Sequence, residues 1–396
     1  MATVLANALL GDASLADMRI DKGLVAAVAP AGTLANVSID LAGALLVPGF
    51  VDGHIHLDKT LLGLPYQRHR PGDTVALRIT NEKELRRDLC YPVEQRAKHL
   101  IARAVASGTT ALRTHVDIDT EIGLTGLEAL LGVKEAVREL IDIEIVAFPQ
   151  SGILSDPGTA DLLDNAIREG ADLVGGLDPA GIDNDIDGHL ETIFGIAERR
   201  GVGLDIHLHD PGPLGCFELR LIAERTAACG LGGRVAVSHA FALGAVDDVE
   251  FDRTAKALAG AGVAIMTNGP GPVPMPPVKR LVAAGVTVFA GSDNIRDAWS
   301  PYGNGDMLER AMLIGYRQGF LADADLELAF DLANGAAARV LGLAGHGVKV
   351  GAAADLVAIP SGCIAEAVAA HPPRLLVMKC GRIVARDGKL AASRTS

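Results

Sequence analysis

The stretch Gly49-Phe50-Val51-Asp52-Gly53-His54-Ile55-His56-Leu57-Asp58 continues an apolar run that begins at Ala44. Such a run predicts a buried β-strand. His54 and His56 would lie on the same face of this strand, about 6.6 Å apart along it, because successive side chains alternate between faces. Both imidazoles could then bind one metal ion. Taken alone, the pair is equally compatible with two incidental histidines at a strand end.

Downstream of this strand, seven short apolar runs alternate with longer segments rich in Ala, Leu, Glu and Arg. The runs are residues 110–114, 143–148, 171–176, 203–207, 235–238, 263–267 and 286–291. Helices are expected between them, for example at residues 93–107, 126–140 and 190–200. Eight strands alternating with helices indicate an α/β fold, a (β/α)8 barrel of the TIM type.

The two ends of the chain differ in character from this central part. Residues 1–48 and 347–396 contain short β-prone segments separated by glycine turns. Two terminal segments of the same kind on either side of a barrel would most simply pair with each other. We therefore predict a hydrolase barrel over residues 49–346 and one small β-sandwich domain built from residues 1–48 and 347–396.

Composition excludes several classes of partner and site. The net charge of −13 disfavours nucleic acid and anionic membrane surfaces, which bind basic patches. Five cysteines without a Cys-x-x-Cys pair indicate neither a disulfide framework nor a thiolate zinc site. Asp12 and Asp17 interrupt the first apolar stretch, so neither a signal peptide nor a membrane span is expected. These features predict a cytoplasmic protein.

Side chains suited to metal or proton chemistry cluster at the predicted carboxyl ends of the strands, where barrel active sites are built. They are His54, His56, His115, Gln150, His207, His209, Asp210, His239 and Asp293. For His115 and His209 a hydrogen-bonding role is as compatible with the pattern as a functional one. The fourth strand has no lysine that could be carboxylated to bridge two metals, which favours a single ion. Nitrogen and oxygen donors suit Zn²⁺ or Fe²⁺.

Several of these stretches resemble the amidohydrolase superfamily, in its cytosine deaminase branch. They are residues 49–58, 114–117, 146–152, 238–240 and 291–294. Further stretches are similar to triazine-degrading members that release an alkylamine from a ring carbon, namely residues 56–59, 172–180, 207–210, 292–299 and 301–307. The chain differs from bacterial cytosine deaminase at Asp210, where that enzyme has a glutamate, and at Asn294, where it has an aspartate. Both differences argue against cytosine as the substrate.

The resemblance implies a role for individual residues. His54, His56, His207 and Asp293 would hold the metal, and His239 would orient the attacking water and help deprotonate it. Asp293 would accept the first proton, and Asp210 would carry a proton to the ring nitrogen. Predicted substrate contacts are Gln150, Lys59, Trp299 and Asn294. For Lys59 a solvated side chain, and for Trp299 plain loop packing, are equally compatible with the sequence.

The resulting prediction is a mononuclear metal-dependent hydrolase that replaces an exocyclic amine on a pyrimidine- or triazine-like ring by oxygen. One alternative is ring opening of a cyclic amide, as in hydantoinases and dihydroorotases, against which the missing strand-4 lysine counts. Another is a catalytically silent barrel with a structural metal, which predicts a closed coordination shell. The partner would be a small N-heterocyclic substrate, and the resemblance implies a homo-oligomer.

Overall fold

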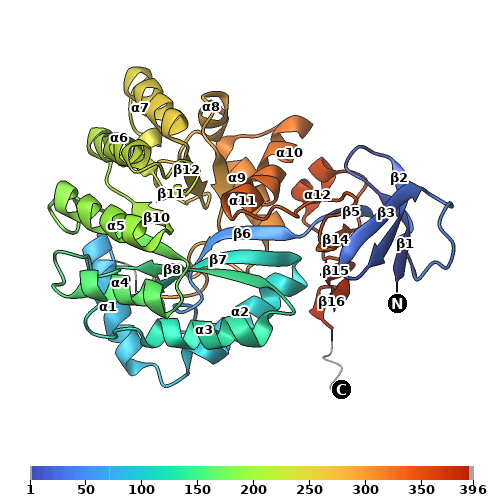
Figure 1. Cartoon of the computed structure of the whole chain (residues 1–396), viewed down its shortest axis with the longest axis horizontal. Coiled ribbons are helices and arrows are strands. Elements are labelled where there is room, and N and C mark those ends of the chain that lie inside the picture. The colour runs from blue at the N-terminus through green and yellow to red at the C-terminus, as the bar shows by residue number, and fades with distance from the viewer. Residues whose placement is uncertain (1, 71, 392–396) are drawn as a thin grey trace.

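The computed structural model describes residues 2–70 and 72–391 and contains two sheets (Figure 1). The larger sheet has eight parallel strands that follow one another in chain order. They are β6 (Phe50–Ile55), β7 (Thr109–Asp117), β8 (Asp142–Phe148), β9 (Leu173–Leu177), β10 (Gly203–Leu208), β11 (Val235–His239), β12 (Val263–Thr267) and β13 (Val288–Ala290). The predicted (β/α)8 barrel is confirmed.

The first and last strands of this sheet approach each other just beyond the end of β13. A parallel bridge joins Ile55 and Asp293, and the amide of Asp293 donates to the carbonyl of His54 at 2.7 Å. The sheet is thereby brought almost to a closed barrel.

Helices connect successive strands and cover the barrel. They are α1 (Val75–Asp88), α2 (Val93–Ala106), α3 (Thr125–Val137), α4 (Thr159–Glu169), α5 (Ile186–Arg200), α6 (Gly212–Ala228), α7 (Asp248–Ala261), α8 (Val278–Ala283), α9 (Met307–Gln318), α10 (Asp323–Leu332) and α11 (Gly335–Val340), with a 3₁₀ turn at Phe241–Gly244. The predicted helices at residues 93–107, 126–140 and 190–200 overlap α2, α3 and α5. Two helices, α1 and α2, lie between β6 and β7, so one of them is additional to the barrel repeat.

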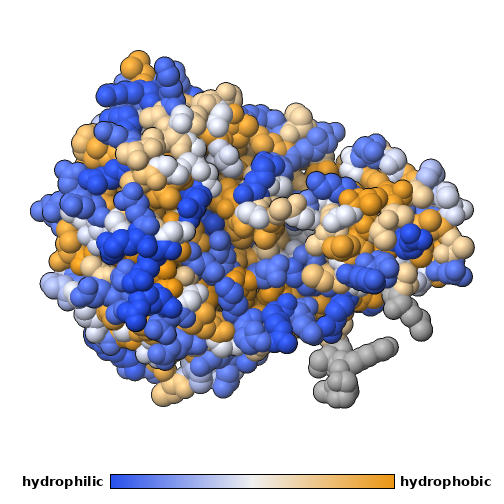
Figure 2. All heavy atoms as spheres, viewed as in Figure 1, coloured by the Kyte–Doolittle hydropathy of each residue, from blue (hydrophilic) through white to orange (hydrophobic). Residues whose placement is uncertain are grey.

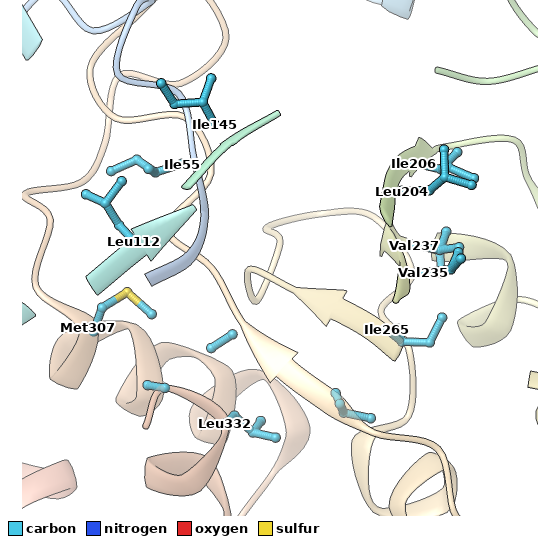
Figure 3. Close-up of a cluster of buried hydrophobic side chains, with 14 of the residues drawn as sticks. Ile55, Leu112, Ile145, Leu204, Ile206, Val235, Val237, Ile265, Met307 and Leu332 are labelled. Carbon is cyan, nitrogen blue, oxygen red and sulfur yellow. The ribbon is translucent and has the colours of Figure 1, made fainter. Parts of the chain in front are cut away.

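Side chains alternate along each strand between the helices and the barrel interior. In β10, Leu204, Ile206 and Leu208 belong to the apolar core shared with the helices, whereas Asp205 and His207 point to the other face. Figure 3 shows Leu204 and Ile206 in this core, which extends to side chains of α9 and α10. The polar residues of the strands are therefore collected inside the barrel.

The amino-terminal end of the barrel interior is filled by apolar side chains. Val51, Ala111, Ala236, Ala264, Met266 and Phe289 form a separate buried cluster with the alanines of α11. This cluster leaves the polar interior facing the carboxyl ends of the strands.

The second sheet is built from both ends of the chain, as predicted. Its strands are β1 (Thr3–Leu9), β2 (Leu15–Asp21), β3 (Leu24–Pro30), β4 (Ile39–Asp40), β5 (Leu45–Pro48), β14 (Leu356–Ile359), β15 (Leu376–Lys379), β16 (Arg382–Arg386) and β17 (Lys389–Leu390), with α12 (Ile364–Ala370) after β14. Hydrogen bonds join all nine strands into one mixed sheet, in which β5 pairs with β14. The domain boundaries at residues 48/49 and 346/347 stay predictions.

The two faces of the terminal sheet are buried in different cores. Leu356 and Ala358 of β14 belong to the core of the small domain. Val357 and Ile359, which alternate with them, belong to the core of the barrel. The terminal sheet is therefore packed into the barrel by one side of its central strands.

The exterior of the molecule is of mixed character. Figure 2 shows hydrophilic side chains over much of the barrel helices, interspersed with apolar ones. Within residues 2–70 and 72–391, none of the helices combines the length and the apolar character that crossing a membrane requires.

Gly291 is a position at which barrel closure leaves no room for a side chain. A Cβ atom there would lie 2.5 Å from His54 Cβ and 2.8 Å from the His54 carbonyl oxygen. We expect Gly291→Ala to lower the free energy of unfolding by about 1–3 kcal/mol, the usual cost of overpacking. Chemical denaturation measures this loss.

Gly260 provides the matched control. It lies exposed in α7, where an added Cβ meets nothing within 4 Å. Gly260→Ala should be neutral or stabilise the protein by up to about 1 kcal/mol through helix propensity. Equal stability of the two variants would contradict the proposed tight closure.

Candidate active site

Four predicted metal ligands converge at the carboxyl end of the barrel. The Nε2 atoms of His54 and His56 lie 3.6 and 3.5 Å from Asp293 Oδ1. The Nε2 atom of His207 lies 3.4 Å from His56 Nε2. These side chains come from β6, β10 and the segment after β13, and the three histidines are buried.

A chain of hydrogen bonds sets the tautomer of His54. Asp205 accepts the hydroxyl proton of Ser238 at 2.8 Å, and it also accepts from Arg113 at 2.9 Å. Burial acts to raise the pKa of Asp205, but His115 and Arg113 hold it far below its usual range. Because the Ser238 proton is used on Asp205, the Ser238 oxygen must accept from His54 Nδ1, 2.8 Å away. His54 Nε2 is then left unprotonated.

The donor set fits a divalent metal ion. His54 Nε2 is buried without a hydrogen-bond partner among the described residues, and its lone pair faces the other donors. Burial acts to raise the pKa of Asp293, but His239, His54 and His56 lower it well below its usual range. Three imidazole nitrogens and one carboxylate oxygen are ligands suited to Zn²⁺ or Fe²⁺.

His115 lies directly beneath the predicted ligands. Its ring centroid is 4.0 Å from that of His54, and its Nε2 is 3.5 Å from Asp205 Oδ1. Burial and the neighbouring His54 lower its pKa to about 4, so the ring is neutral at pH 7. His115 can add a further nitrogen to the cluster that contains His54, His56 and His207.

Three residues at the rim have the left-handed backbone conformation that non-glycine residues rarely adopt. The φ angles are 35° at Asp178, 74° at His239 and 60° at Asp293. Such strain is often found at functional sites. The Asp293 side chain is also fixed by Asn268, whose Nδ2 donates to Oδ2 at 2.7 Å.

His239 and His209 lie face to face at the mouth. Their ring centroids are 4.5 Å apart and the planes are inclined by 26°. Asp178 Oδ2 lies 2.8 Å from His209 Nδ1. Burial acts to lower the pKa of His209, but Asp178 raises it above its usual value. His209 is therefore an imidazole that Asp178 holds in place and whose protonated form Asp178 favours; the sequence left its role open.

Asp210 belongs to a carboxyl pair beside this histidine. Its Oδ2 accepts from the Gly181 amide at 3.0 Å, and it shares a hydrogen bond with Glu218. Burial and Asp210 raise the pKa of Glu218 to about 8, so Glu218 is protonated at pH 7 and is the donor in this pair. Burial and Asp178 also raise the pKa of Asp210.

Three of the predicted substrate contacts lie in one network. Lys59 Nζ donates to Gln150 Oε1 and to Glu82 Oε2 at 3.1 Å, and it forms an ion pair with Asp117 Oδ1 at 3.0 Å. The indole N–H of Trp299 donates to the same Glu82 oxygen at 2.8 Å. Lys59 is buried, which disagrees with a solvated side chain. Glu82 itself was not among the predicted site residues.

Asn294, the fourth predicted contact, lies next to Asp293. Its Nδ2 donates to Asp297 Oδ2 at 2.7 Å. Because a carboxylate only accepts, the amide must face Asp297 with its NH₂ group, which leaves the Asn294 oxygen available as an acceptor.

Comparison with known proteins matches this site and fold to one family. The sequence profile of the amidohydrolase family matches residues 38–390. The chain belongs to the amidohydrolase family. The resemblance stated from the sequence motifs is thus confirmed, as is a metal-dependent hydrolase acting on carbon–nitrogen bonds.

Individual relatives match nearly the whole chain. N-isopropylammelide isopropyl amidohydrolase of Pseudomonas sp. (strain ADP) is 36% identical over 366 residues, 89% of each chain. The crystal structure of N-isopropylammelide isopropylaminohydrolase from Burkholderia multivorans is 44% identical, with a TM-score of 0.95 over 99% of this chain and 100% of that one. The 5-methylcytosine deaminase structure from Klebsiella pneumoniae is 28% identical, with a TM-score of 0.89 over 99% of both chains.

Ser238 offers a direct test of the metal-binding tautomer. Ser238→Ala removes the acceptor of His54 Nδ1, so the ring is no longer held with Nε2 bare. We expect affinity for Zn²⁺ to fall by about 10- to 100-fold, as is usual for residues that orient metal ligands. Competition with a chromogenic chelator measures it. Ser14→Ala, at an exposed serine of the small domain, is the control, and unchanged affinity in Ser238→Ala would refute the proposed chain.

Proposed function

We propose that this amidohydrolase hydrolyses an exocyclic carbon–nitrogen bond of a pyrimidine- or triazine-like ring and releases ammonia or an alkylamine. The observation that carries the proposal is the convergence of His54, His56, His207 and Asp293 beside His239 and His209 at the carboxyl end of the barrel. Relatives named for action on N-isopropylammelide and 5-methylcytosine support the choice of substrate class.

One divalent ion, Zn²⁺ or Fe²⁺, would be held by His54, His56, His207 and Asp293. The strand β9 reads Leu-Val-Gly-Gly-Leu and supplies no lysine for a second ion. When bound, such an ion polarises a water molecule and lowers its pKa from 15.7 to about 7.

His239 and Asp293 would manage the first proton. His239 projects from the strained end of β11 beside Asp293, so its ring can orient the attacking water. Asp293 is ionised because its pKa is held low, so its carboxylate has an oxygen that can accept the water proton and pass it on. Attack forms a carbon–oxygen bond and gives a tetrahedral ring carbon.

Breaking the carbon–nitrogen bond requires a proton on the departing amine, because amide anions are poor leaving groups. Asp210 is the carrier predicted from the sequence; it accepts from the protonated Glu218 at rest, and its raised pKa favours uptake of a proton that it then passes to the ring nitrogen. His209 is a second candidate, favoured by its stacking on His239 and by its anchor on Asp178. In the balanced reaction one water proton ends on the amine and the other on the oxygenated ring.

Recognition of the ring would fall to Gln150, Asn294, Lys59 and Trp299. Gln150 and Asn294 offer a donor and an acceptor respectively, and Trp299 offers an aromatic face. Lys59 would act on the ring through Gln150, because its ammonium group already contacts Glu82, Gln150 and Asp117.

The decisive experiment is incubation of metal-loaded protein with cytosine, isocytosine, ammelide and N-alkyl ammelides, with products identified by mass spectrometry. Replacement of an amine by oxygen is expected for at least one ring. Addition of water without loss of amine would mean ring opening instead, and a metal-bound protein that changes none of the rings would support a silent barrel. Elemental analysis counts the ions per chain.

Two variants separate the candidates for proton delivery. The variants are His209→Gln and Asp210→Asn. Each is compared with the control Glu224→Gln, which lies on α6 outside the site. Loss of a general acid lowers kcat by about 10²- to 10⁴-fold. The variant that shows this loss while still binding metal identifies the carrier, and wild-type rates in both would exclude this scheme.

We also propose a cytoplasmic location and assembly into a homo-oligomer. Leu214 and Phe217 expose 42% and 46% of their surface on α6, which provides an apolar area for a second copy. Light scattering of the purified protein should give more than one chain per particle, and a monomer at all concentrations would contradict this.

A further inference from the structure

Glu82 connects segments that are distant in the sequence. It lies on α1, and its Oε2 accepts both from Lys59, which follows β6, and from the indole of Trp299, which follows β13. The Glu82 side chain is only 8% exposed. Burial raises the pKa of Glu82, whereas Lys59 and Trp299 favour its charged form.

Lys59 has three close polar partners in this arrangement. Its ammonium group donates hydrogen bonds to Glu82 and Gln150, and it forms an ion pair with Asp117 at 3.0 Å. Burial opposes the charge, but Asp117 and Glu82 raise the pKa of Lys59 above its usual value. Lys59 is therefore held in its charged form, with hydrogen bonds directed at Glu82 and Gln150.

The fixed ammonium group sets the polarity of Gln150. Lysine cannot accept a hydrogen bond, so the side-chain atom of Gln150 that faces it must be the oxygen. The NH₂ group of Gln150 then points elsewhere, and no hydrogen bond engages it among the described residues. Gln150 is thereby prepared to donate to an acceptor, such as a carbonyl oxygen of a ring.

The same carboxylate restricts Trp299. Because its only side-chain N–H group donates to Glu82, the Trp299 side chain can offer a ligand nothing but its aromatic surface. Lys59 Nζ lies 5.5 Å from the Trp299 ring centroid and 5.6 Å from that of Phe148. Phe148 in turn stacks on His207 at 4.0 Å, which places the network next to the predicted metal ligands.

The helix that carries Glu82 is docked onto the barrel rim. Ile79 packs in a cluster with Phe148 and Leu177. One helical turn beyond Glu82, Arg86 contacts Asp117 at 3.5 Å and Asp119 at 3.3 Å. The helix is thus held to the barrel on both sides of Glu82, by Ile79 and by Arg86. Glu82 can therefore hold Lys59 and Trp299 in place.

We propose that Glu82 is a positioning residue for substrate recognition, which orients Gln150 as a donor through Lys59 and orients the face of Trp299. This inference rests on the proposed function. It implies selection of flat rings that present a carbonyl oxygen to Gln150.

Trp299 is the single tryptophan of the chain, so its fluorescence reports this site directly. We compare Glu82→Ala and Glu82→Gln with Glu84→Ala, an exposed control on the same helix. Glu82→Ala should shift the Trp299 emission and raise KM by about 10- to 100-fold, the usual loss with a charged hydrogen-bond partner, while kcat changes less. Glu82→Gln keeps an acceptor oxygen and should restore much of both.

Other results would overturn the proposal. Emission and KM in Glu82→Ala equal to those of Glu84→Ala would show that Glu82 positions nothing. A loss of kcat with unchanged KM and emission would likewise refute it. If the parent protein acts on none of the rings, the proposed function fails, whereas the emission of the three variants still decides whether Glu82 fixes Trp299.

Discussion

Closure of the eight-stranded sheet is the constraint on which the candidate site depends. The amide of Asp293 donates to the carbonyl of His54, and the amide of Ser292 donates to Asp52, so the segment after β13 is joined to β6. The carboxylate of Asp293 is thereby brought within 3.6 Å of the Nε2 atoms of His54 and His56, which lie 239 and 237 residues before it in the sequence, respectively. Without closure, the histidines of β6 would lack their carboxylate partner.

Beneath the site, the barrel holds charges where an apolar core would pack as well. Arg113 and Asp205 are buried, and burying an ion pair has a desolvation cost that its attraction often only balances. The pair instead serves to orient other side chains. Asp205 orients the hydroxyl group of Ser238, and Ser238 in turn orients the ring of His54. Buried groups inside the barrel therefore set the protonation state of His54 at the rim, where its Nε2 atom must present a lone pair.

Periodicity in the sequence predicted the features that depend on it, and missed those that depend on tertiary contacts. The alternation of side chains along a strand predicted that His54 and His56 lie on one face. The position of His207 at the end of its strand predicted that it lies at the same rim of the barrel as these two histidines. The contacts of Glu82 could not be predicted in this way, because its partners lie 23 and 217 residues away. The same holds for the anchor of His209 on Asp178, since nothing local marks an aspartate as a hydrogen-bond partner.

The packing of the terminal sheet has a consequence for biosynthesis. Val47 of β5 pairs with Val357 of β14, and both side chains belong to the barrel core. A ribosome adds about 5–20 residues per second, so β5 waits many seconds for its neighbour to emerge. During translation the barrel is missing part of its hydrophobic interior, and its final consolidation is expected only after almost the entire polypeptide has left the exit tunnel. Late consolidation of the nascent chain is therefore the cost of joining both termini in one sheet.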